Sequence, residues 1–131
     1  MSKFKAEFEE YFILDAMLFF YLFTEVFLMI DNRAKNMFLT TFDGQHFFPI
    51  PYDMDTAMGI NNEGALVFDY NLEDTDILGE DTLVFNGQES VLWINVRRCY
   101  VTELREMYQA LRSNDNKPFS YEAISNKINE H

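Results

Sequence analysis

The chain has little cysteine, histidine and positive charge. A single cysteine in 131 residues excludes an internal disulfide, and the helical pattern around Cys99 favours a buried structural thiol over a nucleophile. The two histidines, His46 and His131, are too far apart in sequence to indicate a metal site. Ten basic residues against 22 acidic ones give a net charge of -12. This charge argues against nucleic-acid binding, because phosphates would be repelled, and it permits binding of cations.

Long apolar runs are also scarce, with one exception at residues 11–30. This run approaches the length that spans a bilayer. Asp15 and Glu25 interrupt it, however, and both would be costly in hydrocarbon. Acidic residues precede it, where a signal peptide needs positive charge. We therefore expect a core helix, with neither a membrane span nor a signal peptide, in a cytoplasmic or particle-associated protein.

The apolar residues that are present predict a mainly α domain. Residues 5–30 contain no Gly or Pro, and their apolar side chains surround the helix axis, which predicts one long central helix. Apolar residues recur at three- and four-residue steps over 91–112, which predicts an amphipathic helix, and a third helix begins at Ser120. The length predicts a single domain, 1–131, with 48% hydrophobic residues to fill its core.

A small β-hairpin is expected between the first two helices. Residues 37–42 and 47–52 are short apolar runs, and Asp43-Gly44 between them is a strong hairpin turn signal. Two prolines in the second run deny amides to a ladder, so this strand should pair on one side only. The fold class is therefore mainly α with a small β-hairpin.

Polar side chains gather at the open ends of this hairpin. The turn should bring Asn36 and Asp53 close together, and an amide oxygen and a carboxylate can share a Mg²⁺ that keeps substrate phosphates in its shell. Asp31, at a helix-to-loop junction, can accept a proton from a hydroxyl nucleophile. Asp55 would face the same side as Asp53 if the backbone stayed extended. Arg33 could help to neutralise a transferring phosphate. Together these residue types suit phosphoryl transfer.

A second acidic region lies at residues 69–81, within a stretch that shows no strong periodicity. The simpler interpretation is a solvated loop packed by its Phe, Leu and Ile side chains. Calcium binding is the alternative, because carboxylates are hard oxygen donors, although the spacing does not match an EF-hand loop.

The order of helix, Asp-x-x-x-x-Asn, strand-turn-strand and Asp resembles the catalytic loop and metal-binding segment in the C-terminal lobe of protein kinases. The sequence is more specifically similar to the spore-coat CotH kinase-like family. The similarity is densest in three segments: 21–25 (YLFTE), 31–39 (DNRAKNMFL) and 51–59 (PYDMDTAMG). A weaker similarity extends over 91–111 and 119–122 in the tail.

This resemblance implies a kinase-like C-terminal lobe and a role for each matching residue. Asp31 would be the catalytic aspartate, and Asn36 and Asp53 would be the metal and cofactor ligands. Asp55 would be a second acidic residue near the metal, and Arg33 would stand where many kinases place a phosphate-contacting lysine. The implied cofactor is ATP with Mg²⁺ or Mn²⁺, and the implied substrate is a protein.

The chain also departs from the kinase pattern. Met29-Ile30 replaces His-Arg before Asp31, and Asp53-Met54-Asp55 replaces Asp-Phe-Gly. No Gly-rich loop or N-terminal lobe with a nucleotide lysine is present, so those elements would have to precede Met1 and the chain would be a fragment. The alternative is a lobe that has lost catalysis and serves as a structural or interaction module, as an oligomer or as a component of a coat or phage-like particle.

Overall fold

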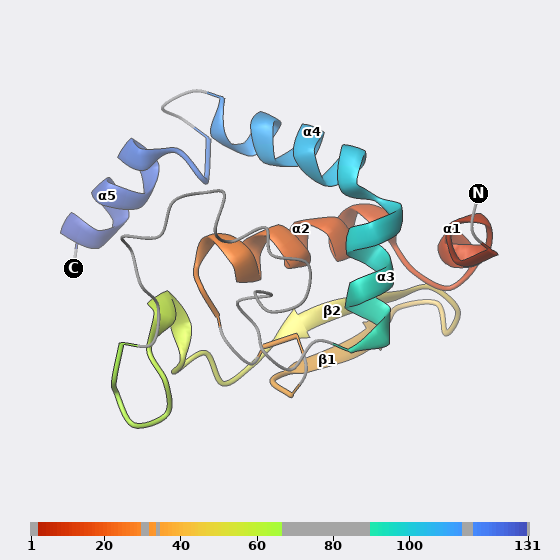
Figure 1. The fold of residues 1–131 in the computed structure, drawn as a ribbon, viewed down its shortest axis with the longest axis horizontal. Coiled ribbons are helices and arrows are strands. Elements are labelled where there is room, and N and C mark those ends of the chain that lie inside the picture. The colour runs from red at the N-terminus through yellow and green to blue at the C-terminus, as the bar shows by residue number, and fades with distance from the viewer. Residues whose placement is uncertain (1–2, 30–31, 34, 67–89, 114–116, 131) are drawn as a thin grey trace.

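The computed structural model describes residues 3–29, 32–33, 35–66, 90–113 and 117–130 (Figure 1). Within these ranges the protein has five α-helices and one two-stranded antiparallel sheet, so the prediction of a mainly α fold with a small hairpin is confirmed. In chain order the elements are α1 (Lys3–Glu7), a 3₁₀ turn (Phe8–Glu10), α2 (Leu14–Val26), β1 (Met37–Thr41), β2 (Phe47–Pro51), a 3₁₀ turn (Ala57–Gly59), α3 (Val91–Cys99), α4 (Val101–Arg112) and α5 (Tyr121–Asn129).

Helix α2 lies at the centre of the molecule. It packs against α4 on one side and against β2 on the other (Figure 1). The ring of Trp93, from α3, stacks on Phe20 of α2 with centroids 5.5 Å apart. Because α2 is covered on both sides, most of its circumference is apolar, and its buried residues are Met17, Leu18, Phe20, Tyr21, Leu22 and Thr24.

The predicted single helix over 5–30 is wrong, because the chain leaves the helix at residues 11–13. There the backbone bonds to the hairpin: Phe47 N–H donates to Tyr11 O at 2.8 Å, and Ile13 N–H donates to Phe47 O at 3.0 Å. Helix α2 then ends at Val26, before Leu28, whose φ of 47° is left-handed. The composition of this segment favours a continuous helix, but residues 11–13 instead pair with a strand that is distant in sequence.

The helix predicted over 91–112 is also two helices, which meet at Tyr100 (φ -123°, ψ 26°). Nζ of Lys5 donates to Cys99 O at 3.1 Å, pairs with Glu103 and lies 4.6 Å from the centre of the Tyr100 ring. A lysine from α1 thus bonds to the last carbonyl of α3, at the point where the two helices meet. Burial, followed by the negative charge of Glu9, raises the pKa of Tyr100, and the bond from Lys5 lowers the pKa of Glu103.

The hairpin has the predicted position and a well-defined register. Phe38 pairs with Ile50, and Leu39 pairs with Pro49. Because Tyr52 N–H donates to Asn36 O at 3.0 Å, and bonded and non-bonded pairs alternate in an antiparallel ladder, the Phe38–Ile50 pair is bonded and the Leu39–Pro49 pair is not. The backbone nitrogen atoms of both prolines of β2 therefore point away from β1, where no ladder bond to β1 needs an N–H. At the two prolines β2 pairs on one side only, as predicted, but at Phe47 it also bonds to residues 11–13 on its other side.

The hairpin tip, residues 42–46, is held by local hydrogen bonds. Oδ1 of Asp43 accepts from the backbone N–H groups of Gln45 and His46, both at 2.8 Å, and Gly44 takes a left-handed φ of 79°. Nδ1 of His46 lies 2.5 Å from Oδ2 of Asp43. The pKa of Asp43 is far below its ordinary value. The largest cause is the hydrogen bond with the side chain of His46, followed by the bonds from the backbone N–H groups and the Thr41 hydroxyl. The predicted turn at Asp43-Gly44 is present, within a loop longer than two residues.

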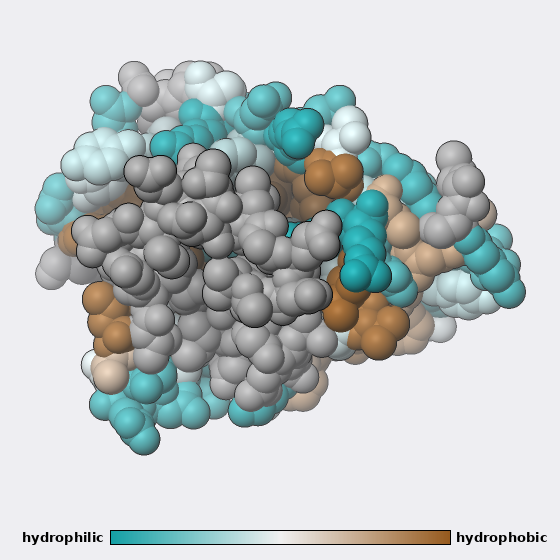
Figure 2. Space-filling view, in the orientation of Figure 1, coloured by the Kyte–Doolittle hydropathy of each residue, from teal (hydrophilic) through white to brown (hydrophobic). Residues whose placement is uncertain are grey.

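The C-terminal helices are amphipathic. Ser120 caps α5, its hydroxyl accepting from Ala123 N–H at 3.2 Å, as expected for a helix that begins there. Hydrophilic residues of α4 form a band along the upper margin of the molecule (Figure 2). Within the ranges described, no helix combines the length and the apolar character that a bilayer crossing requires.

Candidate functional site

The candidate site is the hairpin base, which we define as Asn36 together with Tyr52 and Asp53. Besides the backbone bond from Tyr52 to Asn36, Nδ2 of Asn36 donates to the carbonyl of Asp53 at 3.3 Å. The hairpin thus brings together Asn36 and Asp53, the two residues that the turn was expected to place close to each other. They come from opposite strands, 17 positions apart in the sequence.

Asn32, which sequence reasoning missed, joins both strands at this base. Its Nδ2 donates to the carbonyl of Asn36 at 3.1 Å and to the carbonyl of Tyr52 at 3.0 Å, and its side chain is fully buried. One amide group therefore uses both of its hydrogens to hold the two chain segments in place. The only feature of the sequence that could have indicated this role is an amide side chain with two donors beside Asp31. The partners of Asn32 are backbone carbonyls, and because every residue has one, the sequence does not identify them.

Arg33 is buried beneath this loop instead of facing solvent. Its guanidinium pairs with Glu25 of α2 and lies 4.4 Å from the centre of the Tyr21 ring. An ion pair and a cation–π contact together compensate the charge that burial would otherwise penalise. The side chain of Glu25 is partly buried. The phosphate-neutralising role of Arg33 stays a prediction.

The segment after β2 turns sharply at Asp53. Its φ of 51° is left-handed, so the backbone is not extended, and the condition under which Asp53 and Asp55 would share a face is not met. Both residues are exposed. The chain then returns to the end of α2, where Met58 N–H donates to Phe27 O at 2.7 Å and Gly59 N–H donates to Leu28 O at 3.0 Å.

Left-handed backbone conformations occur at the hairpin base and where the following segment meets the end of α2. Among the described residues, three that are not glycine have a left-handed φ: Leu28, Asp53 and Met58. Such conformations cost of the order of 1–3 kcal/mol each and persist only where the surroundings enforce them. The bonds from Met58 and Gly59 to the end of α2, and the buried Thr56 between them and Asp53, supply that enforcement. Strain of this kind is typical of functional sites.

The donor set at the base fits a magnesium-type ion. The amide of Asn36 and the carboxylate of Asp53 are hard oxygen donors, and Mg²⁺ takes one or two carboxylates together with substrate phosphates. In the part of the chain that the structure describes, no three His, Cys, Asp or Glu side chains gather to form a protein-only metal cage. Asp31 and the acidic stretch 69–81 lie outside the described residues, so their predicted roles stay predictions.

These features define an acidic, mainly helical domain in which polar residues are joined at the base of a hairpin. The sequence matches the family described as CotH kinase protein over residues 1–131, its whole length. The chain therefore belongs to the CotH kinase family, and the resemblance noted in the sequence is confirmed. No curated protein and no solved structure gives a significant match to it.

Proposed function

We propose that this chain is a phosphotransferase domain with the architecture of a kinase C-terminal lobe. It would bind ATP with Mg²⁺ or Mn²⁺ and transfer the terminal phosphate to a hydroxyl group of a protein. Membership of the CotH kinase family supports the class of reaction. The observation that carries the site is the joining of Asn36 and Asp53 at the hairpin base, where the Nδ2–O distance is 3.3 Å.

In this proposal each residue has one task. Asn36 and Asp53 would hold the metal, with Asp55 as a second acidic group close by. Asp31 would accept the proton of the attacking hydroxyl, as the new P–O bond forms and the bond to the leaving ADP breaks. The bound ion would supply neutralisation of the phosphate charges.

Arg33 would add positive charge for the transferred phosphate. To contact a phosphate directly, its guanidinium would have to leave Glu25 and the Tyr21 ring. In the arrangement described, Arg33 instead anchors the loop that carries Asn32 to α2.

Calorimetry of Mg·ATP and Mn·ATP binding tests the proposal. We expect Asp53→Ala to abolish measurable binding, because it removes a carboxylate ligand from a site with few protein ligands. Asp43→Ala is the matched control: it removes the same charge from the opposite end of the same hairpin and should leave binding within about twofold. If the native chain binds no Mg·ATP, or if both variants bind equally well, the proposal is wrong.

A non-catalytic interaction module of a coat or particle is the second candidate. It is favoured by the exposed apolar side chains of the hairpin, among them Phe38 and Phe42. Such a module would bind its partner without nucleotide, and Asp53→Ala would leave that binding unchanged.

A further inference from the structure

The two edges of the hairpin sheet differ in how they are protected. The edge of β2 is closed: the 11–13 segment bonds to Phe47, and Pro49 and Pro51 have no N–H to offer. Strand β1 is the outer strand, on the side away from α2 (Figure 1). Proteins usually blunt such an edge with a lysine, a proline or a bulge. The five residues of β1, MFLTT, contain no lysine or proline.

The free edge of β1 can form further backbone hydrogen bonds. The alternation of the ladder directs the N–H and C=O groups of Met37, Leu39 and Thr41 away from β2. Within the described ranges, these backbone groups bond to no other residue. An extended segment laid along β1 would satisfy them and form a third strand.

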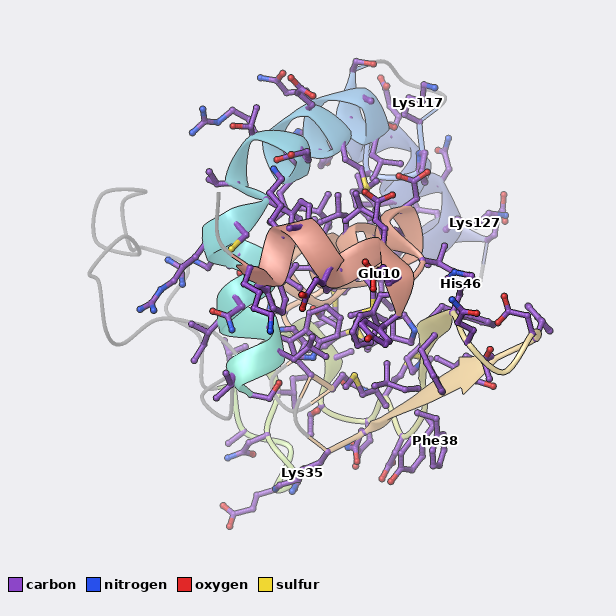
Figure 3. The ribbon with its side chains drawn as sticks, turned by 90° about the vertical axis from the view of Figure 1, so that its right-hand side faces the viewer. Glu10, Lys35, Phe38, His46, Lys117 and Lys127 are labelled. Carbon is purple, nitrogen blue, oxygen red and sulfur yellow. The ribbon has the colours of Figure 1, made fainter. Side chains whose placement is uncertain are left out.

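The face beside this edge is apolar and exposed. Phe38 is 59% exposed, and it projects from β1 on the side away from the helices (Figure 3). Its ring stacks on Tyr52 at 4.6 Å, and Phe42, which is 94% exposed, lies 5.0 Å from Phe48. With Ile50, these four aromatic residues form a surface that we call the outer hairpin face. A third strand would place its alternate side chains next to this surface.

The charges around β1 indicate the kind of partner. Asp43 follows the strand at one end, and Asp53 and Asp55 lie at the other end, beside a single exposed lysine, Lys35. The whole chain carries a net charge of -12. A second copy of the chain would bring the same acidic groups against these, whereas a basic partner would be attracted.

We infer that β1 is a docking edge for an extended segment of another protein, with apolar residues at alternate positions and Lys or Arg at its ends. The segment binds as a third strand, in contact with the outer hairpin face. This docking requires neither nucleotide nor metal, so it stands apart from the proposed phosphoryl transfer and from its test.

Leu39→Pro is the variant that tests the edge. Leu39 faces Pro49 in a pair that makes no ladder bonds, so a proline there removes an outward N–H and leaves the bonds to β2 intact. Leu39→Ala is the matched control, because it removes the same side chain and keeps the N–H. Fluorescence anisotropy with the labelled peptide KKVTITVKK, at about 50 mM salt, measures the affinity.

We expect Leu39→Pro to weaken binding at least about tenfold and Leu39→Ala to weaken it about twofold or less. The acidic peptide EEVTITVEE should bind more weakly than the basic one. Two peptides N-methylated at alternate amides test the edge on the unaltered protein, since only one of the two sets can bond to β1. Equal binding by both methylated peptides, no binding of KKVTITVKK, or equal binding by both Leu39 variants would overturn the inference. A dimer of the native chain in sedimentation, lost in Leu39→Pro, would assign the edge to a second copy and would likewise overturn it.

Discussion

The tip of the hairpin is held mainly by its neighbours in sequence, with one longer-range bond from Gln45 to Glu10, whereas its base is held by a residue 20 positions from one of its partners. At the tip, Asp43 bonds to groups two and three residues away, and the loop is exposed to solvent. At the base, the fully buried Asn32 joins the two strands through their carbonyls. Local bonds in water are replaceable, but a buried bond that is lost leaves a polar group without solvent. The base should therefore be the sensitive end.

The largest expected effect is at Asn32. Asn32→Asp keeps the shape of the side chain but replaces two donors with a carboxylate facing two carbonyls, and it should cost roughly 3–5 kcal/mol of unfolding free energy. This loss of unfolding free energy can be measured by urea unfolding, with the fluorescence of Trp93 as the signal. Trp93 is the single tryptophan and is fully buried. Asn62→Asp makes the same chemical change at an exposed position and should stay within about 0.5 kcal/mol. Equal unfolding midpoints for the two variants would contradict the importance of the base.

A smaller effect is expected at Glu25, which supports the base through Arg33. Glu25→Gln removes the negative charge that pairs with the buried guanidinium and should cost about 2–3 kcal/mol. Adding Arg33→Met should restore most of this loss, because the charge that needs compensation is then gone. Glu7→Gln, in the exposed Lys3–Glu7 pair, is the control, with a cost below about 0.5 kcal/mol. If the double variant is no more stable than Glu25→Gln, the ion pair is not the source of the effect.

The smallest effect is expected at the tip, and it depends on pH. Because the folded pKa of Asp43 lies below its ordinary value of 3.8, the ionised carboxylate stabilises the folded tip above that pH. The stabilisation is lost as the pH falls below this value, because the unfolded chain takes up the proton first. The protection of the Gln45 and His46 amides from exchange, relative to their intrinsic rates at the same pH, should therefore fall in acid.

Two variants sharpen this result. In Asp43→Asn this protection should already be low near neutral pH and should change less with acid. His46→Ala should weaken the acid dependence, because the side chain of His46 is the main cause of the lowered pKa. An acid dependence that is unchanged in both variants would show that Asp43 does not hold the tip.

The difference between contacts that are local in sequence and contacts that are distant explains what the sequence could predict. The hairpin follows from Asp43-Gly44 between two apolar runs, and the closeness of Asn36 and Asp53 follows from the hairpin. Those signals are local. The signals for the two helix breaks are not local, because the residues that contact them, Phe47 and Lys5, are far away in sequence. Composition alone favours unbroken helices at both places.

The role of Asn32 was equally hidden. Its partners are backbone carbonyls, so no pairing of side chains could reveal them. The left-handed turn at Asp53 was missed for a different reason. Aspartate tolerates that conformation better than most residues, but the sequence around it contains no glycine that would signal it.

The pairing of residues 11–13 with Phe47 also bears on solubility. A chain shortened to begin at Leu14 would lose the backbone partners of Phe47 and would expose β2 at that point, leaving only Pro49 and Pro51 to protect this edge. Open strand edges invite association between chains. We therefore expect the pairing of residues 11–13 to limit association between chains at this point of β2.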